Sequence, residues 1–264
     1  FQEMPVDKEI KKDKDLYYRV LNLQNPMADA RTSFFHKSLG GYHGAKMKRY
    51  NELFNYAIEP EMQLLIQGFQ KPEGIDSIMS RLSVINMLNT KYFIYDLNQP
   101  PLPNSHALGN AWLVKSLKVV DSADQEVSAI KSFDPKSTAV VNKNFAKSLG
   151  GFSSGSGEGE IKLTEYQPNY LKYDATISNG PQMAVFSEVY YPKGWKSFID
   201  GKETPHVQVD YVLRAMIVPA GKHQIEFKFE PRSYFMGNKV SLASSFLLLL
   251  AIVGYLVYIF KVKK

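Results

Sequence analysis

Basic residues and glycines gather between Arg31 and Arg49, in a pattern that could bind an anion. Gly40, Gly41 and Gly44 lead into a segment with helical periodicity from about Ala45. The first turn of a helix offers free backbone N–H groups, and neighbouring cations add positive charge. The residues expected to form a substrate-binding site are Arg31, His36, Lys37, Gly40, Gly41, Tyr42, His43, Lys46 and Arg49. The competing interpretation is that the glycines make tight turns and the histidines only pack.

A second group of candidates is aromatic. Tyr190, Tyr191 and Trp195 flank the predicted turn at residues 192–194. Flat aromatic faces suit the C–H faces of sugar rings, so these three residues are candidates for carbohydrate stacking. Packing of Trp195 in a core is the competing interpretation.

Other chemistries lack support in the sequence. His36 and His43 have no acidic or cysteine partner at ligand spacing nearby, so we expect no metal site. No nucleophile-elbow pattern supports a serine–histidine–acid triad. The glycine-rich run at residues 150–159 lacks the lysine of a phosphate-binding loop. We therefore assign no catalytic residue to this chain and expect no cofactor.

Composition narrows the class of protein further. The chain has 264 residues and a net charge of +6, of which Lys261, Lys263 and Lys264 contribute three. The remaining +3 is too small to indicate nucleic-acid binding. Cysteine is absent from the sequence, which excludes disulfides and thiolate chemistry.

A run of 21 residues without a formal charge, Val240–Phe260, indicates a transmembrane helix. At about 1.5 Å per residue the run spans roughly 30 Å, the hydrocarbon thickness of a bilayer. We expect the lipid bilayer to be a partner of this segment, and residues 261–264 to form a basic cytoplasmic tail. A buried core helix is the competing interpretation. The polar start of the chain, with no apolar signal region, suggests the C-terminal piece of a longer membrane protein.

The rest of the sequence predicts an α+β fold in two parts. Residues 1–148 are expected to form a mixed α/β subdomain, and residues 149–159 a Gly/Ser-rich linker or loop. Residues 160–235 alternate in polarity over several short segments, which predicts an antiparallel β-sandwich. The predicted strands lie at residues 16–23, 91–95, 111–120, 138–141, 171–177, 183–191, 195–199, 211–218 and 225–229. Helices are predicted from about residue 45 to a break or kink at Pro60, over 75–88 and over 123–131, and a hairpin at Asp200–Gly201.

Several blocks of the sequence resemble the C-terminal part of the YfhO-type bacterial membrane proteins, in the version found in Bacteroidetes-like bacteria. The resemblance covers nearly the whole chain. The blocks are residues 35–46, 86–92, 107–112, 190–195, 200–202 and 218–223.

The resemblance implies a polytopic protein with a large extracytoplasmic C-terminal region and a last helix that returns to the cytoplasm. Such proteins are similar to GT-C glycosyltransferases, which take sugar from a polyprenyl-phosphate carrier, and their essential acid lies in an early loop outside this sequence. We therefore expect the bacterial inner membrane, with the bulk of the chain on the periplasmic side. The expected partners are a lipid-linked sugar, an envelope glycan and upstream membrane helices of the same protein. The expected function is assistance in cell-envelope glycosylation. The alternative is a non-enzymatic, membrane-anchored carbohydrate-binding or structural module.

Overall fold

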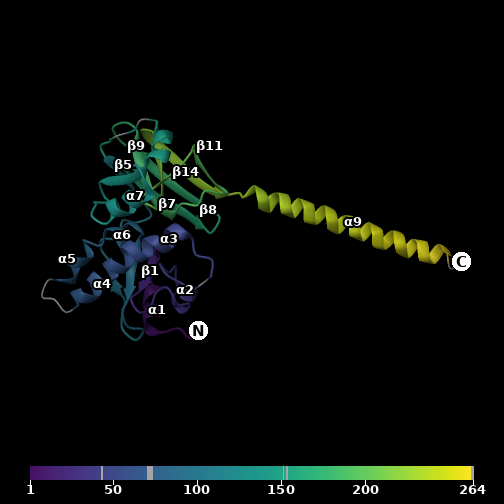
Figure 1. Ribbon diagram of the computed structural model, residues 1–264, viewed down its shortest axis with the longest axis horizontal. Coiled ribbons are helices and arrows are strands. Elements are labelled where there is room, and N and C mark those ends of the chain that lie inside the picture. The colour runs from purple at the N-terminus through teal and green to yellow at the C-terminus, as the bar shows by residue number, and fades with distance from the viewer. Residues whose placement is uncertain (43, 70–73, 151, 153, 263–264) are drawn as a thin grey trace.

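The computed structural model describes residues 1–42, 44–69, 74–150, 152 and 154–262. It confirms the α+β class: helices and a small sheet form one part, antiparallel sheets form another, and a long apolar helix leaves the body (Figure 1). The described helices are α1 (Pro5–Ile10), α2 (Arg31–Phe35), α3 (Lys48–Leu53), α4 (Glu59–Gly68), α5 (Ile75–Met79), α6 (Ser83–Met87), α7 (Ala123–Ile130), α8 (Lys143–Ala146) and α9 (Arg232–Val262). A π-helical turn, η1 (Phe54–Ile58), joins α3 to α4, and a 3-10 turn, η2 (Lys147–Leu149), follows α8.

The described strands fall into four sheets. A three-stranded sheet has the order β1 (Arg19–Asn22), β2 (Thr90–Ile94) and β3 (Leu102–Pro103). A five-stranded sheet has the order β11 (Lys202–Glu203), β10 (Trp195–Ile199), β14 (Gly221–Phe229), β8 (Tyr170–Ile177) and β7 (Gly159–Gln167). A four-stranded sheet has the order β12 (Val207–Val209), β13 (Leu213–Val218), β9 (Gln182–Val189) and β4 (Ala111–Val114). A parallel pair joins β5 (Ser116–Val120) and β6 (Thr138–Asn142).

The four-stranded sheet is covered on both faces. One face packs against the five-stranded sheet around Tyr173, Phe186 and Phe227, whose rings meet edge to face at 4.9–6.1 Å. The other face packs against the helical part through residues such as Val185 and Leu213. Burial on both faces explains why residues 183–186 of β9 are all apolar instead of alternating with polar residues.

The single strand predicted over residues 111–120 is wrong, because the chain divides there. β4 pairs with β9 in the sandwich, while β5 pairs in parallel with β6. Lys115 lies between them, and its N–H donates to Ser137 O at 2.8 Å. β4 therefore belongs to a sandwich sheet although it precedes the glycine-rich run in the sequence.

The helix predicted from about Ala45 begins at Lys48 and continues beyond Pro60. Proline lacks an N–H and crowds the carbonyl four residues before it, here that of Tyr56. The helix accommodates Pro60 through η1, in which Glu59 N donates to Phe54 O, five residues back. The helix predicted over 75–88 is also divided, into α5 and α6. Glu61 binds the start of α6, where its carboxylate accepts from Val84 N at 2.9 Å and Ile85 N at 2.8 Å.

The hairpin predicted at Asp200–Gly201 is present. Both residues have positive φ, 50° and 78°, and they connect β10 to β11. Positive φ at both central positions is the geometry that two-residue hairpins favour.

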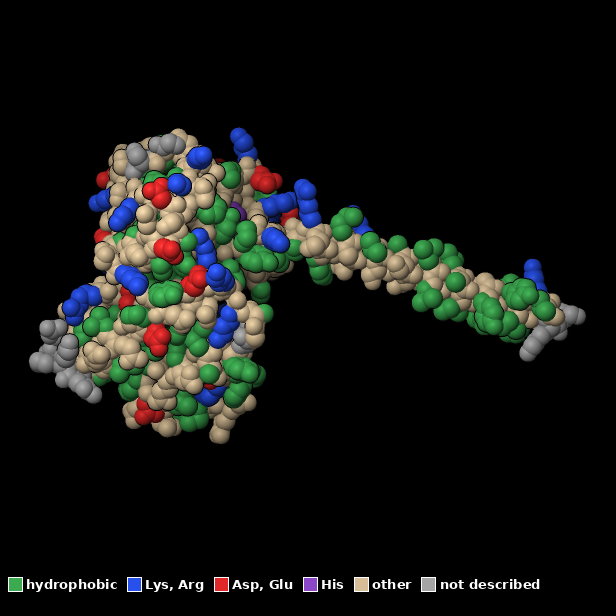
Figure 2. Space-filling model, in the orientation of Figure 1, with side chains coloured by type: hydrophobic (Ala, Val, Ile, Leu, Met, Phe, Trp, Pro, Cys, Tyr) green, Lys and Arg blue, Asp and Glu red, His purple; other side chains and the backbone are tan. Residues whose placement is uncertain are grey.

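Helix α9 confirms the predicted apolar helix and extends it at the N-terminal end. It has 31 residues, and none of them is buried against the body. Figure 2 shows apolar side chains covering α9, with basic side chains near both ends. A core helix would be buried, so this exposure favours a membrane span over the competing interpretation.

Candidate functional site

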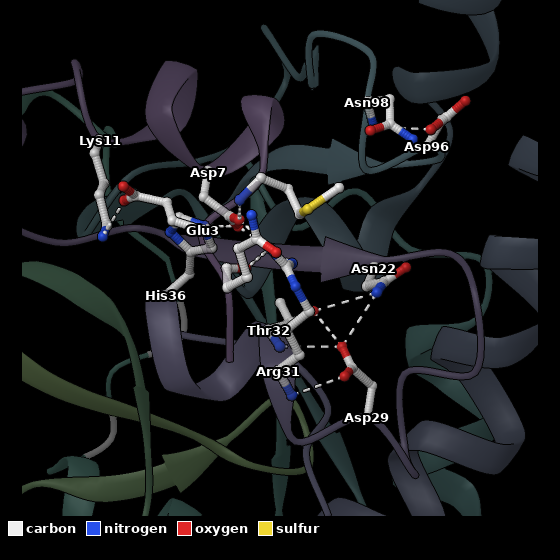
Figure 3. A network of polar contacts seen from close by, with 12 residues as sticks. Glu3, Asp7, Lys11, Asn22, Asp29, Arg31, Thr32, His36, Asp96 and Asn98 are labelled. Carbon is white, nitrogen blue, oxygen red and sulfur yellow. Dashed lines mark hydrogen bonds and ion pairs between the residues drawn. The ribbon is translucent and has the colours of Figure 1, made fainter.

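Two of the predicted site residues, Arg31 and His36, contact Asp7, an acid that no sequence motif marks. Asp7 is 0% exposed, on α1, and forms an ion pair with Arg31 of α2. Its Oδ1 contacts His36 Nε2 at 2.9 Å, and its Oδ2 accepts from Met4 N at 2.8 Å (Figure 3). Arg31 and His36 are therefore bound to an acid inside the fold.

The electrostatics of this network favour a charged Asp7 and a neutral His36. Burial raises the pKa of Asp7, but hydrogen bonds from Arg31, Met4 N and His36 outweigh it and hold the pKa below 3.8. Burial lowers the pKa of His36 below 6.5, and this effect outweighs the attraction of Asp7. A neutral His36 that donates Nε2–H to Asp7 keeps Nδ1 as an acceptor.

A second acid positions the start of α2. Asp29 accepts hydrogen bonds from Arg31 N at 2.8 Å, Thr32 N at 3.1 Å and the Asn22 amide at 3.1 Å (Figure 3). These bonds satisfy N–H groups that the first turn of a helix leaves free. Asp29 therefore fixes α2, and with it the backbone of Arg31.

The predicted glycines bring two backbone segments close together. Gly41 N donates to Pro26 O at 2.8 Å, and a Cβ on Gly40 would lie 2.0 Å from the same oxygen. Gly41 also has a φ of +126°, which favours glycine. Gly44 has open space around it. Since α3 starts four residues after Gly44, the glycines do not lead directly into a helix N-terminus.

Three of the predicted residues, Gly40, Gly41 and Lys46, line an apolar cleft of about 300 Å³, which we call the Lys46 cleft. Its lining residues are Met27, Leu39, Gly40, Gly41, Ala45, Lys46, Met47, Tyr50 and Val189. Among the described residues, the Lys46 ammonium has one hydrogen-bond partner, Met27 O at 3.0 Å, which leaves two of its three N–H groups for a ligand. The arrangement can hold an apolar chain with an anion at its rim.

Arg49 lies outside both the Asp7 network and the Lys46 cleft. Its Nη1 donates to Glu126 Oε2 at 3.1 Å and to Tyr211 O at 3.0 Å, and its guanidinium lies over the Tyr211 ring at 4.7 Å. Arg49 thus connects α3, α7 and the turn before β13.

The remaining predicted residues are dispersed. The Lys37 ammonium lies 5.6 Å from the Tyr166 ring, and Tyr42 is 74% exposed. His43 lies outside the described residues. The predicted set therefore divides among the Asp7 network, the Lys46 cleft and the Arg49 contacts, and its role in binding stays a prediction.

The aromatic candidates differ in exposure. Trp195 packs against the Arg214 guanidinium at 4.1 Å and the Phe229 ring at 5.3 Å, which occupies much of its surface. Tyr190 packs against Phe145 and His206. Tyr191 is 40% exposed. All three line a cleft of about 210 Å³ together with Ser197 and His206, so carbohydrate stacking there also stays a prediction.

Several buried polar residues had no signal in the sequence. Asp210, Glu126, Arg19 and Arg214 are each at most 6% exposed. Their neighbours come from distant parts of the chain: Arg19, for example, donates to Leu88 O at 2.7 Å and Ser187 O at 2.8 Å. Residue spacing cannot reveal such contacts. Among the residues that the structure describes, no group of three or more acidic or histidine side chains could hold a metal ion.

Comparison with known proteins agrees with the resemblance. Residues 132–241, which extend from just before β6 into the first turns of α9, match the family model described as Bacterial membrane protein YfhO. No curated protein and no solved structure matches the chain. This matched part of the chain is therefore similar to the YfhO family of bacterial membrane proteins, and the long apolar helix agrees with a membrane protein.

Proposed function

We propose that this chain is the extracytoplasmic C-terminal region and last helix of a polytopic, inner-membrane protein that acts like glycosyltransferases dependent on polyprenyl-phosphate sugars. In this proposal, the body assists the glycosylation of an envelope glycan or lipid and holds the head of the lipid-linked sugar. The chemistry itself would take place in upstream membrane helices of the same protein.

The observation that carries the proposal is the Lys46 cleft. Its apolar walls suit a hydrocarbon chain, and the free donors of Lys46 suit a phosphate. A polyprenyl phosphate combines these two features in one molecule.

The place of this cleft supports the same ligand. Val189, in the wall of the cleft, ends β9, and six residues later β10 begins with Trp195. Trp195 pairs with Phe229, and α9 begins three residues after Phe229. The wall of the cleft at Val189 is therefore close in sequence to the strand end from which the chain enters α9. Figure 1 shows α9 leaving the body at that end of the sandwich. Residues 232–239 add about 12 Å of helix before the charge-free run, so this end faces the headgroup layer.

The alternative function is a non-enzymatic, membrane-anchored carbohydrate-binding or structural module. The cleft at Tyr191 and His206 favours it, because an exposed tyrosine beside polar side chains can bind a sugar without reaction. Upstream membrane spans with an acid in the first outside loop would favour the enzyme.

The test is binding of undecaprenyl phosphate to the full chain in nanodiscs, followed by native mass spectrometry. We expect Lys46→Ala and Met47→Asp each to weaken binding about tenfold, because they remove the charge or the apolar wall. Lys118→Ala is the matched control, since Lys118 is exposed on β5 and outside the cleft. Equal binding by Lys46→Ala and the parent chain, or equal preference for phosphatidylglycerol, would refute the assignment.

A further inference from the structure

The cleft of about 530 Å³ between α3 and α7 has a different lining from the Lys46 cleft. Figure 1 shows the two helices next to each other where the helical part meets the sheets. The side chains around this cleft, which we call the Tyr56 cleft, are those of Lys48, Arg49, Glu52, Tyr56, Ala123, Asp124, Val127, Ser128, Lys131 and Tyr211. Its volume is within the usual range for small-molecule sites.

Two unusual backbone features border this cleft. Tyr56 lies in the π-helical turn η1, a rare element that occurs frequently at functional sites. On the other side, Asp210 and Tyr211 have consecutive φ values of 48° and 70°. Left-handed conformations of residues other than glycine cost of order 1–3 kcal/mol each and cluster at binding sites.

Hydrogen bonds to the backbone and to the hydroxyl of Tyr211 hold it in its left-handed conformation. Its N–H donates to Glu126 at 3.1 Å, and its carbonyl accepts from Arg49 at 3.0 Å and Gln208 at 2.8 Å. Its hydroxyl donates to Glu52 Oε2 at 2.7 Å. Because these contacts fix both the ring and the carboxylate of Glu52, the floor of the cleft is rigid before any ligand arrives.

The charges of the cleft indicate what kind of ligand it fits. Three cations, Lys48, Arg49 and Lys131, are balanced by the acids Glu52, Asp124 and Glu126. A phosphate or carboxylate ligand would meet repulsion as well as attraction. A neutral ligand with many hydroxyls can instead donate to the carboxylates and accept from the ammonium groups.

An aromatic surface completes the site. Tyr56 is 55% exposed, and the Lys131 ammonium lies 5.6 Å from its ring. An exposed, flat ring beside fixed polar groups suits the apolar face of a sugar. We propose that the Tyr56 cleft binds a neutral saccharide, with Tyr56 under the sugar ring and Glu52, Asp124 and Lys131 bonding its hydroxyls.

This site goes beyond the proposed function, since it binds a saccharide that carries no lipid or phosphate. Its test uses free glycosides and variants of the Tyr56 cleft, whereas the test of the Lys46 cleft uses undecaprenyl phosphate and variants of that cleft. A failure of either test therefore leaves the other assignment standing.

The experiment is saturation-transfer NMR on the full chain in detergent-free nanodiscs. The probes are the methyl glycosides of glucose, galactose, mannose and N-acetylglucosamine. We expect at least one to bind, and Tyr56→Ala to weaken that binding about tenfold, while Tyr56→Phe keeps it. Asp124→Asn should weaken binding in the same direction, because it removes an acceptor.

A matched control separates this cleft from other tyrosines. Tyr95→Ala removes an exposed tyrosine that lies outside every cleft described above, and it should not change the affinity. The proposal is overturned if no glycoside binds, if Tyr56→Ala binds as the parent does, if Tyr191→Ala abolishes binding, or if glucose 1-phosphate binds more tightly than methyl glucoside.

Discussion

Replacing Asp210 by asparagine should stabilise this protein, although Asp210 is one of its most buried polar residues. Its side chain is 0% exposed, and its Oδ1 accepts from Val140 N at 2.7 Å. Its Oδ2 has no hydrogen-bond partner among the described residues. Burial, opposed by the bond from Val140 N, raises the pKa of Asp210 from 3.8 to about 8. At pH 7 the folded protein therefore holds a protonated carboxyl that the unfolded chain would ionise.

The size of the stabilisation follows from the difference between the pKa of Asp210 in the folded protein and its pKa in the unfolded chain. Each pH unit above 3.8 costs the folded state about 1.4 kcal/mol until the folded pKa is reached. The cost at pH 7 is about 4 kcal/mol, and at pH 5 it is about 2 kcal/mol. Because the folded pKa is raised, the stability that Asp210 contributes is complete below pH 3.8 and is lost as the pH rises through 8. Asparagine does not ionise, still accepts from Val140 N, and tolerates the φ of 48°.

Thermal unfolding of the full chain in nanodiscs, followed by tryptophan fluorescence at pH 5, 7 and 8, measures the effect. We expect Asp210→Asn to raise the midpoint at pH 7 by roughly 10 °C, with a larger gain at pH 8 and a smaller one at pH 5. Asp200→Asn is the matched control, since Asp200 also has positive φ but is exposed, at 54% of its side chain. A gain with Asp200→Asn, a loss with Asp210→Asn, or a gain that does not grow with pH would refute the reasoning.

Three further predictions concern the Asp7 network, the glycines and the orientation. Asp7→Asn should lower the free energy of unfolding by about 3–5 kcal/mol, because it leaves the partly buried Arg31 without its acid. Urea unfolding at pH 7 measures this change, and a change under about 1 kcal/mol would contradict the prediction. Gly40→Ala should lower the midpoint of thermal unfolding, because its Cβ would meet Pro26 O, whereas Gly44→Ala should not; equal midpoints would contradict this. Protease added to intact spheroplasts should digest residues 1–231, and their survival beside a digested outward-facing control would reverse the proposed orientation.

Local sequence patterns were sufficient for the elements whose environment is uniform. The charge-free run predicted an apolar helix because a bilayer selects length and composition alone, and α9 agrees. Strict alternation predicted β8 and β14, since each has one face in the sandwich core and one in solvent. The Asp200–Gly201 turn was predictable because its positive φ angles restrict which residues fit.

Local patterns were insufficient where adjacent parts of one segment pair with strands of different sheets. Residues 111–120 have the apolar character of one strand, but β4 and β5 join different sheets, and no local preference decides such a division. Pro60 similarly suggested a break or kink in a helix. In the structure the helical segment continues past Pro60 through the π-helical turn η1, in which Glu59 N donates to Phe54 O.

Composition, periodicity and motif order were enough to predict the membrane helix, the α+β class and the resemblance to the YfhO family. The roles of the charged residues, in contrast, depend on the tertiary structure. It bound Arg31 to Asp7 and Arg49 to Glu126, left Lys46 with free donors at an apolar cleft, and buried Asp210 away from water. The physical reason is that the free energy of a charge depends on its solvation and its partners, and folding sets both over distances in the sequence that no local pattern spans.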